Sequence, residues 1–336
     1  MKKLNVGLVG YGYWGPNLAR NISETADVEL SFIAERDPAR RNLAVKKHSR
    51  TKCVSHYRDF ILNSSIDAVV IATPAHTHLE IARTALERGK HVWVEKPLAP
   101  SAGEAEELCD VAKKVKKVLL VDHTFVYTPA VQKMREIVAS KKLGEIYYFD
   151  SIRINLGLFY PDVNVIWDLA PHDLSILQFV LNKKVKSVLA TGQSFARNHK
   201  ENIAYISLEL EDRILAHIHV NWLSPIKVRS TIIGGSRRML VYDDLNPDEK
   251  IRIYDRGVKD FSKDGFYRSM VKYRTGDTYA PYIERKEALK IEAEHFIECI
   301  RKNKRPMTDG EVGLEVVRTL EAIDRSLSQG GARVEL

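Results

Sequence analysis

A charged pair directly follows one of the short apolar segments of the chain. The run His91–Val94 ends in Glu95 and Lys96, and Pro97 comes next. A lysine here is either a surface residue or a partly buried amine suited to proton transfer. Glu95 could orient the Lys96 ammonium or contact a cofactor. Pro97 sets the direction of the chain after Lys96, through either a trans or a cis peptide bond.

A second candidate pair consists of an acid and a histidine four residues apart, Asp168 and His172. Because proline is best tolerated in the first turn of a helix, Pro171 predicts a helix that starts near Asp168. Side chains at positions i and i+4 share one helix face, so the pair could relay a proton. The alternative is a capping aspartate with a structural histidine. Asp173 is then expected to be the exposed acid of this segment.

A glycine-rich turn, Gly10-Tyr11-Gly12-Tyr13-Trp14-Gly15, stands between the β-type run Leu4–Val9 and a helical segment that opens at Pro16. This is the GxGxxG pattern in its required context. The three glycines permit a tight turn, the approach of a pyrophosphate and close packing of helix on strand. The N-terminus of the helix attracts phosphate. The predicted cofactor contacts of this turn are Gly10, Gly12, Tyr13, Trp14 and Gly15.

The residues after the next strands predict which dinucleotide binds. Glu35 lies 20 residues after Gly15, where a carboxylate hydrogen-bonds the adenosine ribose and repels a 2′-phosphate. We therefore favour NAD over NADP, although Arg36 could stack on adenine or reach a 2′-phosphate. Thr73 and Pro74 follow another apolar run and should line the cofactor groove. The predicted cofactor contacts that follow these strands are Glu35, Arg36, Thr73, Pro74, His78, Glu95 and Lys96. Among them, His78 is expected to hold the cofactor loop.

The pattern of apolar residues divides the chain at about residue 122. Short β-branched runs alternate with helical stretches before this point, which predicts a parallel sheet covered on both faces. Longer alternating runs follow it, which predicts an α+β region with a large, mainly antiparallel sheet. We expect an α/β protein with a dinucleotide-binding domain over residues 1–122 and a substrate-binding and oligomerisation domain over residues 123–336.

The composition of the chain indicates which classes of molecule the protein is expected to bind. The chain has 336 residues and a net charge of +8, which suits a multiply anionic small molecule. The basic clusters lack the interleaved aromatic residues of a nucleic-acid platform, so no nucleic acid is expected. The three cysteines have no metal-ligand spacing, and no metal is expected. No apolar run reaches about 18 residues, so we expect no membrane span and a cytoplasmic protein.

These motifs, in this order, resemble the glucose-fructose oxidoreductase / inositol dehydrogenase / MocA family. The resemblance rests on the glycine turn, the Thr73-Pro74…His78 segment, Glu95-Lys96-Pro97, Asp168-x-x-x-His172 and the closing segment at 295–310. It implies a Rossmann domain, an open sheet that often forms oligomer contacts, and hydride transfer between a sugar-type carbinol and a nicotinamide. Lys96 and His172 are then catalytic, with Asp168 in support. Ala75 replaces the asparagine that many members carry.

Within that family, residues 153–173 look closest to enzymes that oxidise C3 of UDP-N-acetylglucosaminuronic acid for surface polysaccharides. The resemblance places Trp167 near the nicotinamide, and it leaves open whether Lys96 or His172 is the base. The alternatives are an inositol or aldose dehydrogenase of this family and a non-catalytic NAD-binding regulator. A homo-oligomer, dimer or tetramer, is expected. The predicted substrate contacts are Lys96, Arg153 for an anion, Asn155, Asn164, Asp168 and His172.

Overall fold

The computed structural model describes residues 3–62, 65–157, 163–195, 200–259 and 272–336. The chain forms two compact units, each considered by itself below. Unit 1 comprises residues 1–128 and 286–318, and unit 2 comprises residues 129–285 and 319–336. The sequence placed everything after residue 122 in a single domain. The structure differs, because residues 286–318 return to the N-terminal unit.

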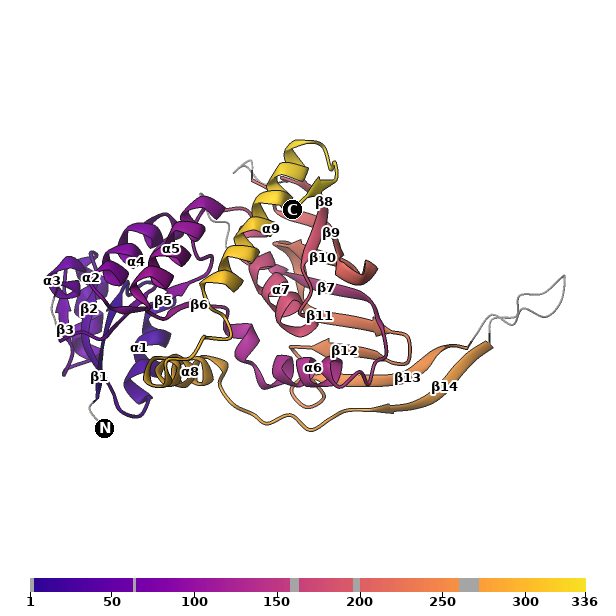
Figure 1. Ribbon diagram of the computed structural model, residues 1–336, viewed down its shortest axis with the longest axis horizontal. Helices are drawn as coiled ribbons and strands as arrows, with labels where there is room; N and C mark the ends of the chain where they lie inside the picture. Colours follow the sequence, from indigo (N-terminus) through magenta and orange to yellow (C-terminus); the bar gives the residue numbers. More distant parts are fainter. Residues whose placement is uncertain (1–2, 63–64, 158–162, 196–199, 260–271) are drawn as a thin grey trace. The chain divides into compact units, whose positions relative to one another are not determined.

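Unit 1 contains a six-stranded parallel sheet in the order β3-β2-β1-β4-β5-β6 (Figure 1). The strand order reverses between β1 and β4, and ligands bind at such a switch point beyond the carboxyl ends of the strands. The glycine turn follows β1, and Lys96 follows β5, so both stand at this edge. The strands are β1 (Leu4–Val9), β2 (Val28–Ala34), β3 (Lys52–Val54), β4 (Ala68–Ile71), β5 (His91–Glu95) and β6 (Leu119–Asp122).

Helices connect these strands and cover the sheet. Asp37 caps α2 and Ser101 caps α5, each by accepting a hydrogen bond from a first-turn backbone N–H. Helices α4 and α5 pack side by side (Figure 1). The helices of unit 1 are α1 (Gly15–Glu24), α2 (Pro38–Lys47), α3 (Arg58–Ile61), η1 (Ala75–Thr77), α4 (His78–Glu87), α5 (Ala102–Val115), η2 (Thr124–Tyr127) and α8 (Ala288–Lys302).

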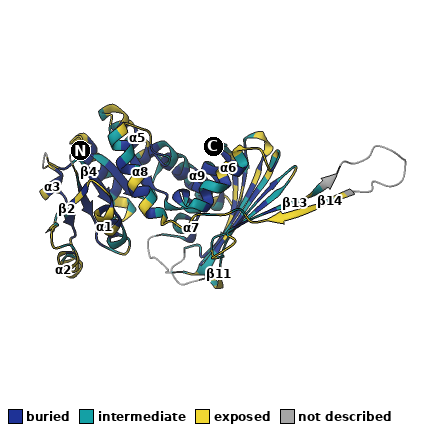
Figure 2. Cartoon of the chain, turned by 90° about the horizontal axis from the view of Figure 1, so that it is seen from below, coloured by how far each residue is buried: buried dark blue, intermediate teal, exposed yellow. Residues whose placement is uncertain are grey.

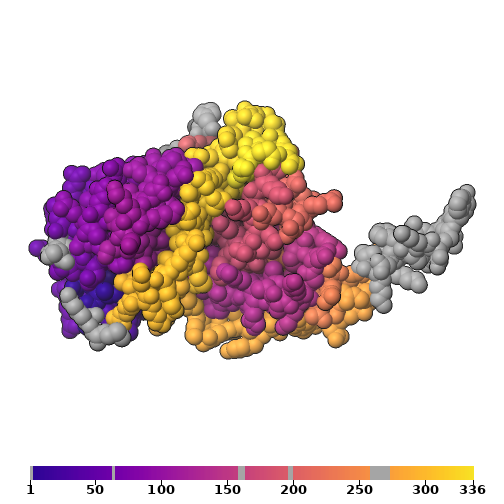
Figure 3. Space-filling view, in the orientation of Figure 1, coloured from indigo at the N-terminus to yellow at the C-terminus, as the bar shows by residue number. Residues whose placement is uncertain are grey.

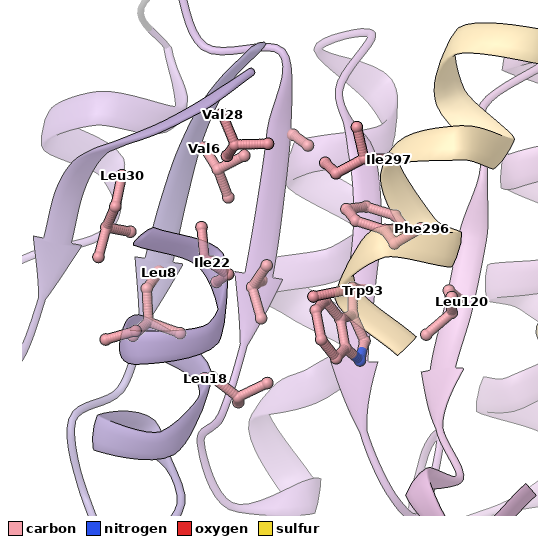
Figure 4. Close-up of a cluster of buried hydrophobic side chains, with 14 of the residues drawn as sticks. Val6, Leu8, Leu18, Ile22, Val28, Leu30, Trp93, Leu120, Phe296 and Ile297 are labelled. Carbon is pink, nitrogen blue, oxygen red and sulfur yellow. The ribbon is translucent and has the colours of Figure 1, made fainter. Parts of the chain in front are cut away.

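Helix α8 belongs to unit 1 because its apolar face completes the core of that unit. Leu289, Ala293, Phe296 and Ile297 recur at helical spacing and are buried. The Phe296 ring packs 5.7 Å from the Trp93 ring of β5, among side chains of β1 and α1 (Figure 4). In the space-filling view the golden residues of α8 lie against the indigo N-terminal residues (Figure 3). Burial of this apolar face explains the return of the chain.

Unit 2 contains a nine-stranded sheet in the order β14-β13-β12-β11-β7-β10-β9-β8-β15. All its described pairs are antiparallel except β7 with β10. The predicted fold class is confirmed. The strands are β7 (Ile146–Leu156), β8 (Val185–Gln193), β9 (Ile203–Leu210), β10 (Leu215–Asn221), β11 (Leu223–Gly235), β12 (Met239–Asp243), β13 (Ile251–Lys259), β14 (Lys272–Tyr279) and β15 (Val334–Glu335).

Helices α6 (Pro129–Ala139) and α7 (Val165–Leu181) pack together, and α7 lies on the sheet. Residues of the central strands alternate between buried and more exposed, as expected when helices cover one face only. Strand β14 is exposed along most of its described length (Figure 2). The short η3 (Glu211–Arg213) joins β9 to β10, and α9 (Gly310–Ser328) begins in unit 1 and ends in unit 2.

Candidate active site

Two glycines of the turn after β1 are required by the packing of the protein itself. Gly10 has a φ of +95°, and a Cβ atom there would lie 2.5 Å from the carbonyl oxygen of Ala72. A Cβ atom on Gly15 would lie 2.6 Å from the carbonyl oxygen of Gly10. Both distances are too short for real atoms. The turn is therefore tight, and α1 lies close to β1.

Gly12 differs from these two glycines. A Cβ atom at Gly12 would meet only the Arg40 Nη1 atom, at 3.5 Å, so protein packing does not require a glycine. Beside it, α1 begins without a side-chain cap and has Pro16 in its first turn. The N–H groups at such a helix start attract anions. An open space above a glycine next to an uncapped helix start fits the pyrophosphate of a dinucleotide.

Glu35 at the end of β2 binds the glycine turn directly. Its Oε2 atom accepts a hydrogen bond from the Tyr11 backbone N–H at 2.7 Å, and its Oε1 atom accepts one from the Asp37 N–H at 2.9 Å. Each carboxylate oxygen has a second lone pair, so the predicted contact with the ribose is compatible with this arrangement. Arg36 is exposed beside it.

His78 connects the loops that follow β4 and β5. Its Nε2 atom lies 2.8 Å from the Thr73 carbonyl oxygen, and its Nδ1 atom lies 2.9 Å from the Pro97 carbonyl oxygen. Burial lowers the pKa of His78, and a neutral imidazole donates to one of these two carbonyls at a time. This bridge agrees with the predicted role of His78 in holding the loop that contains Thr73 and Pro74.

Lys96 stands at the carboxyl end of β5 and is half-buried. The Lys96–Pro97 peptide bond is cis. The backbone N–H of Lys96 donates to the Glu95 Oε2 atom at 3.1 Å. His123 lies nearby and is fully buried, and burial together with the Lys96 charge lowers the pKa of His123 to about 3. His123 is therefore neutral at physiological pH.

Three carboxyl groups, those of Glu95, Asp122 and Glu292, gather behind Lys96 in unit 1. Asp122 accepts hydrogen bonds from Trp14 Nε1, at 3.2 Å, and from the Thr124 hydroxyl. Burial, followed by the Asp122 charge, raises the pKa of Glu95 and that of Glu292 well above the usual range. This cluster ties Trp14 of the glycine turn to the end of β5.

Sequence reasoning missed Asp122, His123 and Glu292. Two signals could have found the acids. Asp122 ends β6, the strand next to β5, and parallel strands end at the same edge of a sheet. Glu292 interrupts the otherwise apolar face of α8, between Leu289 and Phe296. A charged residue at a core position is unusual and indicates a specific environment.

The structure corrects the predicted start of the helix that carries Asp168 and His172. Helix α7 begins at Val165, with Asn164 as its cap, and Pro171 lies inside it. The prediction was wrong because Asn164 supplies the start signal, its Oδ1 atom accepting from the Trp167 N–H at 3.0 Å. Pro171 removes one hydrogen bond to the Trp167 carbonyl, and the burial of α7 along most of its length outweighs that loss.

Asp168 and His172 still share one face of α7, in unit 2. Asp168 lies in the first turn, and its Oδ2 atom accepts a hydrogen bond from Trp222 Nε1 at 3.1 Å. Trp167 Nε1 donates to Asp324 Oδ2 at 2.7 Å. Trp222 thus orients the Asp168 carboxylate, while His172 stands half-buried one turn further along.

The structure does not support the predicted anion contact of Arg153. Arg153 is 3% exposed, and its Nε and Nη2 atoms donate to the two carboxylate oxygens of Asp173 at 2.7 and 3.1 Å. Asp173 is itself buried, so the prediction that it is exposed was wrong. The Arg153 side chain, which comes from β7, contacts Asp173 of α7, so its charge is paired within unit 2.

The two predicted asparagine contacts also have partners within the protein. Asn164 uses its oxygen as the helix cap, and its Nδ2 atom donates to Glu201 Oε2 at 3.0 Å. Asn155 is half-buried and donates to the Leu156 carbonyl oxygen at 2.8 Å. Asn155 is the better placed of the two for a ligand, because its oxygen accepts no described hydrogen bond. Residues 158–162, which separate them, lie outside the described residues.

The parallel sheet with its glycine turn, open cradle and lysine at the carboxyl edge defines a nicotinamide-dinucleotide oxidoreductase. Comparison with family models agrees. Residues 4–123 match the model described as "Oxidoreductase family, NAD-binding Rossmann fold", and residues 131–241 match the "GFO/IDH/MocA C-terminal domain". The chain belongs to the Gfo/Idh/MocA family of oxidoreductases. The resemblance inferred from its motifs is confirmed.

The similarity to individual relatives extends over much of the chain. An uncharacterized oxidoreductase, YdgJ, of Escherichia coli is 32% identical over 74% of this chain and 73% of the relative. A UDP-N-acetylglucosamine 3-dehydrogenase of Acidithiobacillus ferrooxidans is 26% identical over 94% and 95%, respectively. The solved structure of a levoglucosan dehydrogenase with NADH and L-sorbose has a TM-score of 0.85 at 20% identity, covering 100% of this chain and 99% of its own.

These findings settle the cofactor and the general activity. The chain is an NAD-dependent oxidoreductase, as predicted, and not merely a binding protein. No helix within the described ranges is long and apolar enough to cross a membrane.

Proposed function

We propose that the enzyme oxidises the C3 hydroxyl of a UDP-linked N-acetyl sugar to the 3-keto sugar. The first candidate is UDP-N-acetylglucosaminuronic acid, on the way to sugars of surface polysaccharides. The observation that carries the proposal is Lys96, half-buried at the carboxyl end of β5 beside the glycine turn. The choice of sugar is supported by the near full-length similarity to a UDP-N-acetylglucosamine 3-dehydrogenase.

The candidate residues of each unit have their own task. NAD, when bound, supplies the acceptor for the hydride. In unit 1, Gly12 and the start of α1 hold the pyrophosphate, and Glu35 holds the ribose. The Lys96 Nζ atom accepts the proton of the C3 hydroxyl, or His172 of unit 2 does. Asp168, oriented by Trp222, supports His172.

UDP-N-acetylglucosamine is the second candidate substrate. The burial of Arg153 and its pairing with Asp173 remove the residue that we expected to bind an anionic group of the substrate, of which the carboxylate of a uronate is one. The relative that acts on UDP-N-acetylglucosamine supports the same choice. A neutral sugar needs no such cationic contact.

The test is an NADH-formation assay across UDP-N-acetylglucosaminuronic acid, UDP-N-acetylglucosamine, UDP-glucuronic acid, myo-inositol and glucose. Turnover should be fastest with one of the two N-acetylated UDP sugars. Oxidation of inositol or glucose alone would overturn the proposal. NADP should replace NAD poorly, because Glu35 repels a 2′-phosphate.

A substitution separates chemistry from binding. Lys96→Met should lower kcat by about 10²–10⁴-fold, the usual contribution of a general base, a loss far larger than any change in NAD affinity titrated by calorimetry. An unchanged kcat would assign the base to His172.

We also propose that the chain forms a homo-oligomer through the face of the nine-stranded sheet opposite α7. Strand register places Ile152, Leu189, Tyr205 and Leu215 together there, each more than a third exposed. Apolar patches of this kind favour association. Analytical ultracentrifugation should find a dimer or tetramer, and a monomer would refute this proposal.

A further inference from the structure

The three carboxyl groups behind Lys96 come from three separate elements of unit 1. Glu95 ends β5, Asp122 ends β6, and Glu292 lies on α8. Asp122 and Glu292 are buried, with 2% and 0% exposure, and the Glu95 Oε1 atom is closed to solvent although the residue as a whole is half-buried. Three buried carboxylates in contact cannot all be ionised, because desolvation and mutual repulsion both oppose it.

Among the three carboxyl groups, Asp122 is the one whose two oxygens each accept a hydrogen bond. The Trp14 indole N–H and the Thr124 hydroxyl both donate to it, one to each carboxylate oxygen. Hydrogen bonds donated to a carboxylate favour its ionised form. Asp122 is therefore the member of the cluster best supplied with donors to carry a negative charge.

Glu292 is in the opposite situation. Within the described part of the chain, neither of its buried carboxyl oxygens accepts a well-aligned hydrogen bond, and the nearby Thr124 hydroxyl, which opposes the rise of its pKa, donates to Asp122. The neighbouring groups are instead Asp122 and Glu95. An ionised Glu292 would be an uncompensated buried charge, whereas a protonated Glu292 can donate to Asp122. Burial and the Asp122 charge raise the pKa of Glu292 accordingly.

Glu95 lies between these two cases. Its Oε2 atom accepts a hydrogen bond from the Lys96 backbone N–H at 3.1 Å, but burial and the Asp122 charge raise its pKa well above the usual range despite this bond and the Lys96 charge. The other titratable groups around the cluster are neutral at physiological pH. Burial and Lys96 lower the pKa of His123 to about 3. Burial and Glu292 raise the pKa of Tyr127 well above its usual range, and its hydroxyl lies 2.9 Å from the Thr308 hydroxyl. Buried this closely, the three carboxyl groups favour shared protons over three charges.

We propose that Asp122 and Glu292 hold Glu95 in its protonated form, so that the group next to Lys96 is a neutral acid rather than a carboxylate. A carboxylate at Glu95 would stabilise the Lys96 ammonium and oppose its use as a proton acceptor. Asp122 and Glu292 are then positioning residues that act through Glu95. This inference rests on the proposed role of Lys96 as the base.

Kinetics with matched variants test the inference. Glu95→Gln imitates the protonated acid, so the acidic limb of its pH profile should stay at the wild-type position, whatever the size of its kcat/KM. Asp122→Asn removes the charge that keeps Glu95 protonated. Glu95 should then ionise, and the acidic limb should move up by about one pH unit, a tenfold loss of kcat/KM below the limb.

The double variant Glu95→Gln/Asp122→Asn is the rescue experiment. With no carboxyl left at position 95, the limb should return to its wild-type position even if Asp122→Asn also weakens NAD binding. A limb that stays displaced in the double variant would overturn the inference. A limb displaced in Glu95→Gln alone would overturn it as well, because Glu95 would then act on Lys96 as a carboxylate.

Infrared difference spectroscopy gives a readout that does not depend on turnover. At neutral pH the wild type should show the C=O stretch of protonated carboxylic acids, and Glu292→Gln and Glu95→Gln should each remove part of it. Glu294→Gln, an exposed acid on the same helix, is the control and should leave the band unchanged. If the band is present but no sugar is oxidised, the proposed function fails while the protonation pattern stands. If neither variant reduces the band, the inference fails.

Discussion

The two units bury carboxyl groups in opposite ways. In unit 1, Glu292 is completely buried among other acids, with its pKa raised by burial and by Asp122. In unit 2, Asp173 is equally buried, but three donors surround it: the Arg153 Nε and Nη2 atoms and the Ser151 hydroxyl. Glu292 avoids a buried charge by holding a proton, whereas the carboxylate of Asp173 is compensated by its ion pair with Arg153.

The supply of donors decides between these two outcomes. A buried carboxylate is tolerated where N–H and O–H groups point at both of its oxygens. Arg153 provides a planar fork that matches Asp173, whereas none of the described residues offers such a fork to Glu292. The pair in unit 2 consequently has a structural role. The cluster in unit 1 holds protons that can be lost, and it lies beside Lys96.

The largest expected effect concerns the ion pair of unit 2. Arg153→Leu leaves Asp173 as an unpaired buried charge, and the free energy of unfolding should fall by about 3–5 kcal/mol. Chemical denaturation monitored by circular dichroism measures this loss. Arg285→Leu, which removes an exposed ion pair with Asp248, should have no measurable effect.

A double variant sharpens the same prediction. Replacing both partners, as in Arg153→Leu/Asp173→Leu, should recover part of the stability lost in Arg153→Leu, because no buried charge remains. If the double variant is less stable than the single one, Asp173 contributes through contacts other than the ion pair.

An effect of opposite sign is expected for Glu292→Gln. The pKa of Glu292 in the folded protein lies above its ordinary value of 4.5. The folded state therefore keeps a proton that the unfolded state releases. Its contribution to stability is complete below about pH 4.5 and is lost as the pH rises toward the folded pKa.

Thermal unfolding between pH 5 and pH 8 measures this difference. The wild type should lose up to about 1.4 kcal/mol of stability per pH unit for each such proton. Glu292→Gln should show a flatter dependence and be relatively more stable at pH 8. Glu294→Gln should follow the wild type. Parallel curves for all three proteins would contradict the assignment of a proton to Glu292.

The smallest expected effect concerns the link between the cluster and the glycine turn. Trp14→Phe removes the indole N–H that donates to Asp122 but keeps an aromatic ring. Losing one hydrogen bond of about 1 kcal/mol should weaken NAD binding about fivefold. Isothermal titration calorimetry measures it. An unchanged affinity would show that the cluster does not position the turn.

Local patterns predicted much of the architecture. The GxGxxG turn, the alternating strands and helices of the first half, and the longer alternating strands of the second half all appear in the structure. Periodicity reports which face of an element is buried, and this information is contained in neighbouring residues. The place of Pro171 was misjudged because helix propensity is weaker evidence than the cap at Asn164 and the burial of α7.

Arg153 shows what local sequence patterns cannot predict. Its position on a strand indicated a charged side chain near a ligand, but only strand register and the packing of α7 bring it to Asp173. Glu292 shows the same limit, because α8 is remote in sequence from β5 and β6.

The sequence by itself determined the fold class, the family and the cofactor, and it predicted Lys96 and His172 as the two candidate bases. These follow from residue types at short spacing, where backbone geometry fixes which side chains share an edge or a face. Only the tertiary structure decided which charges are paired and which are neutralised by protons. Those outcomes depend on desolvation and on donors from distant segments, and neither has a signature in the local sequence.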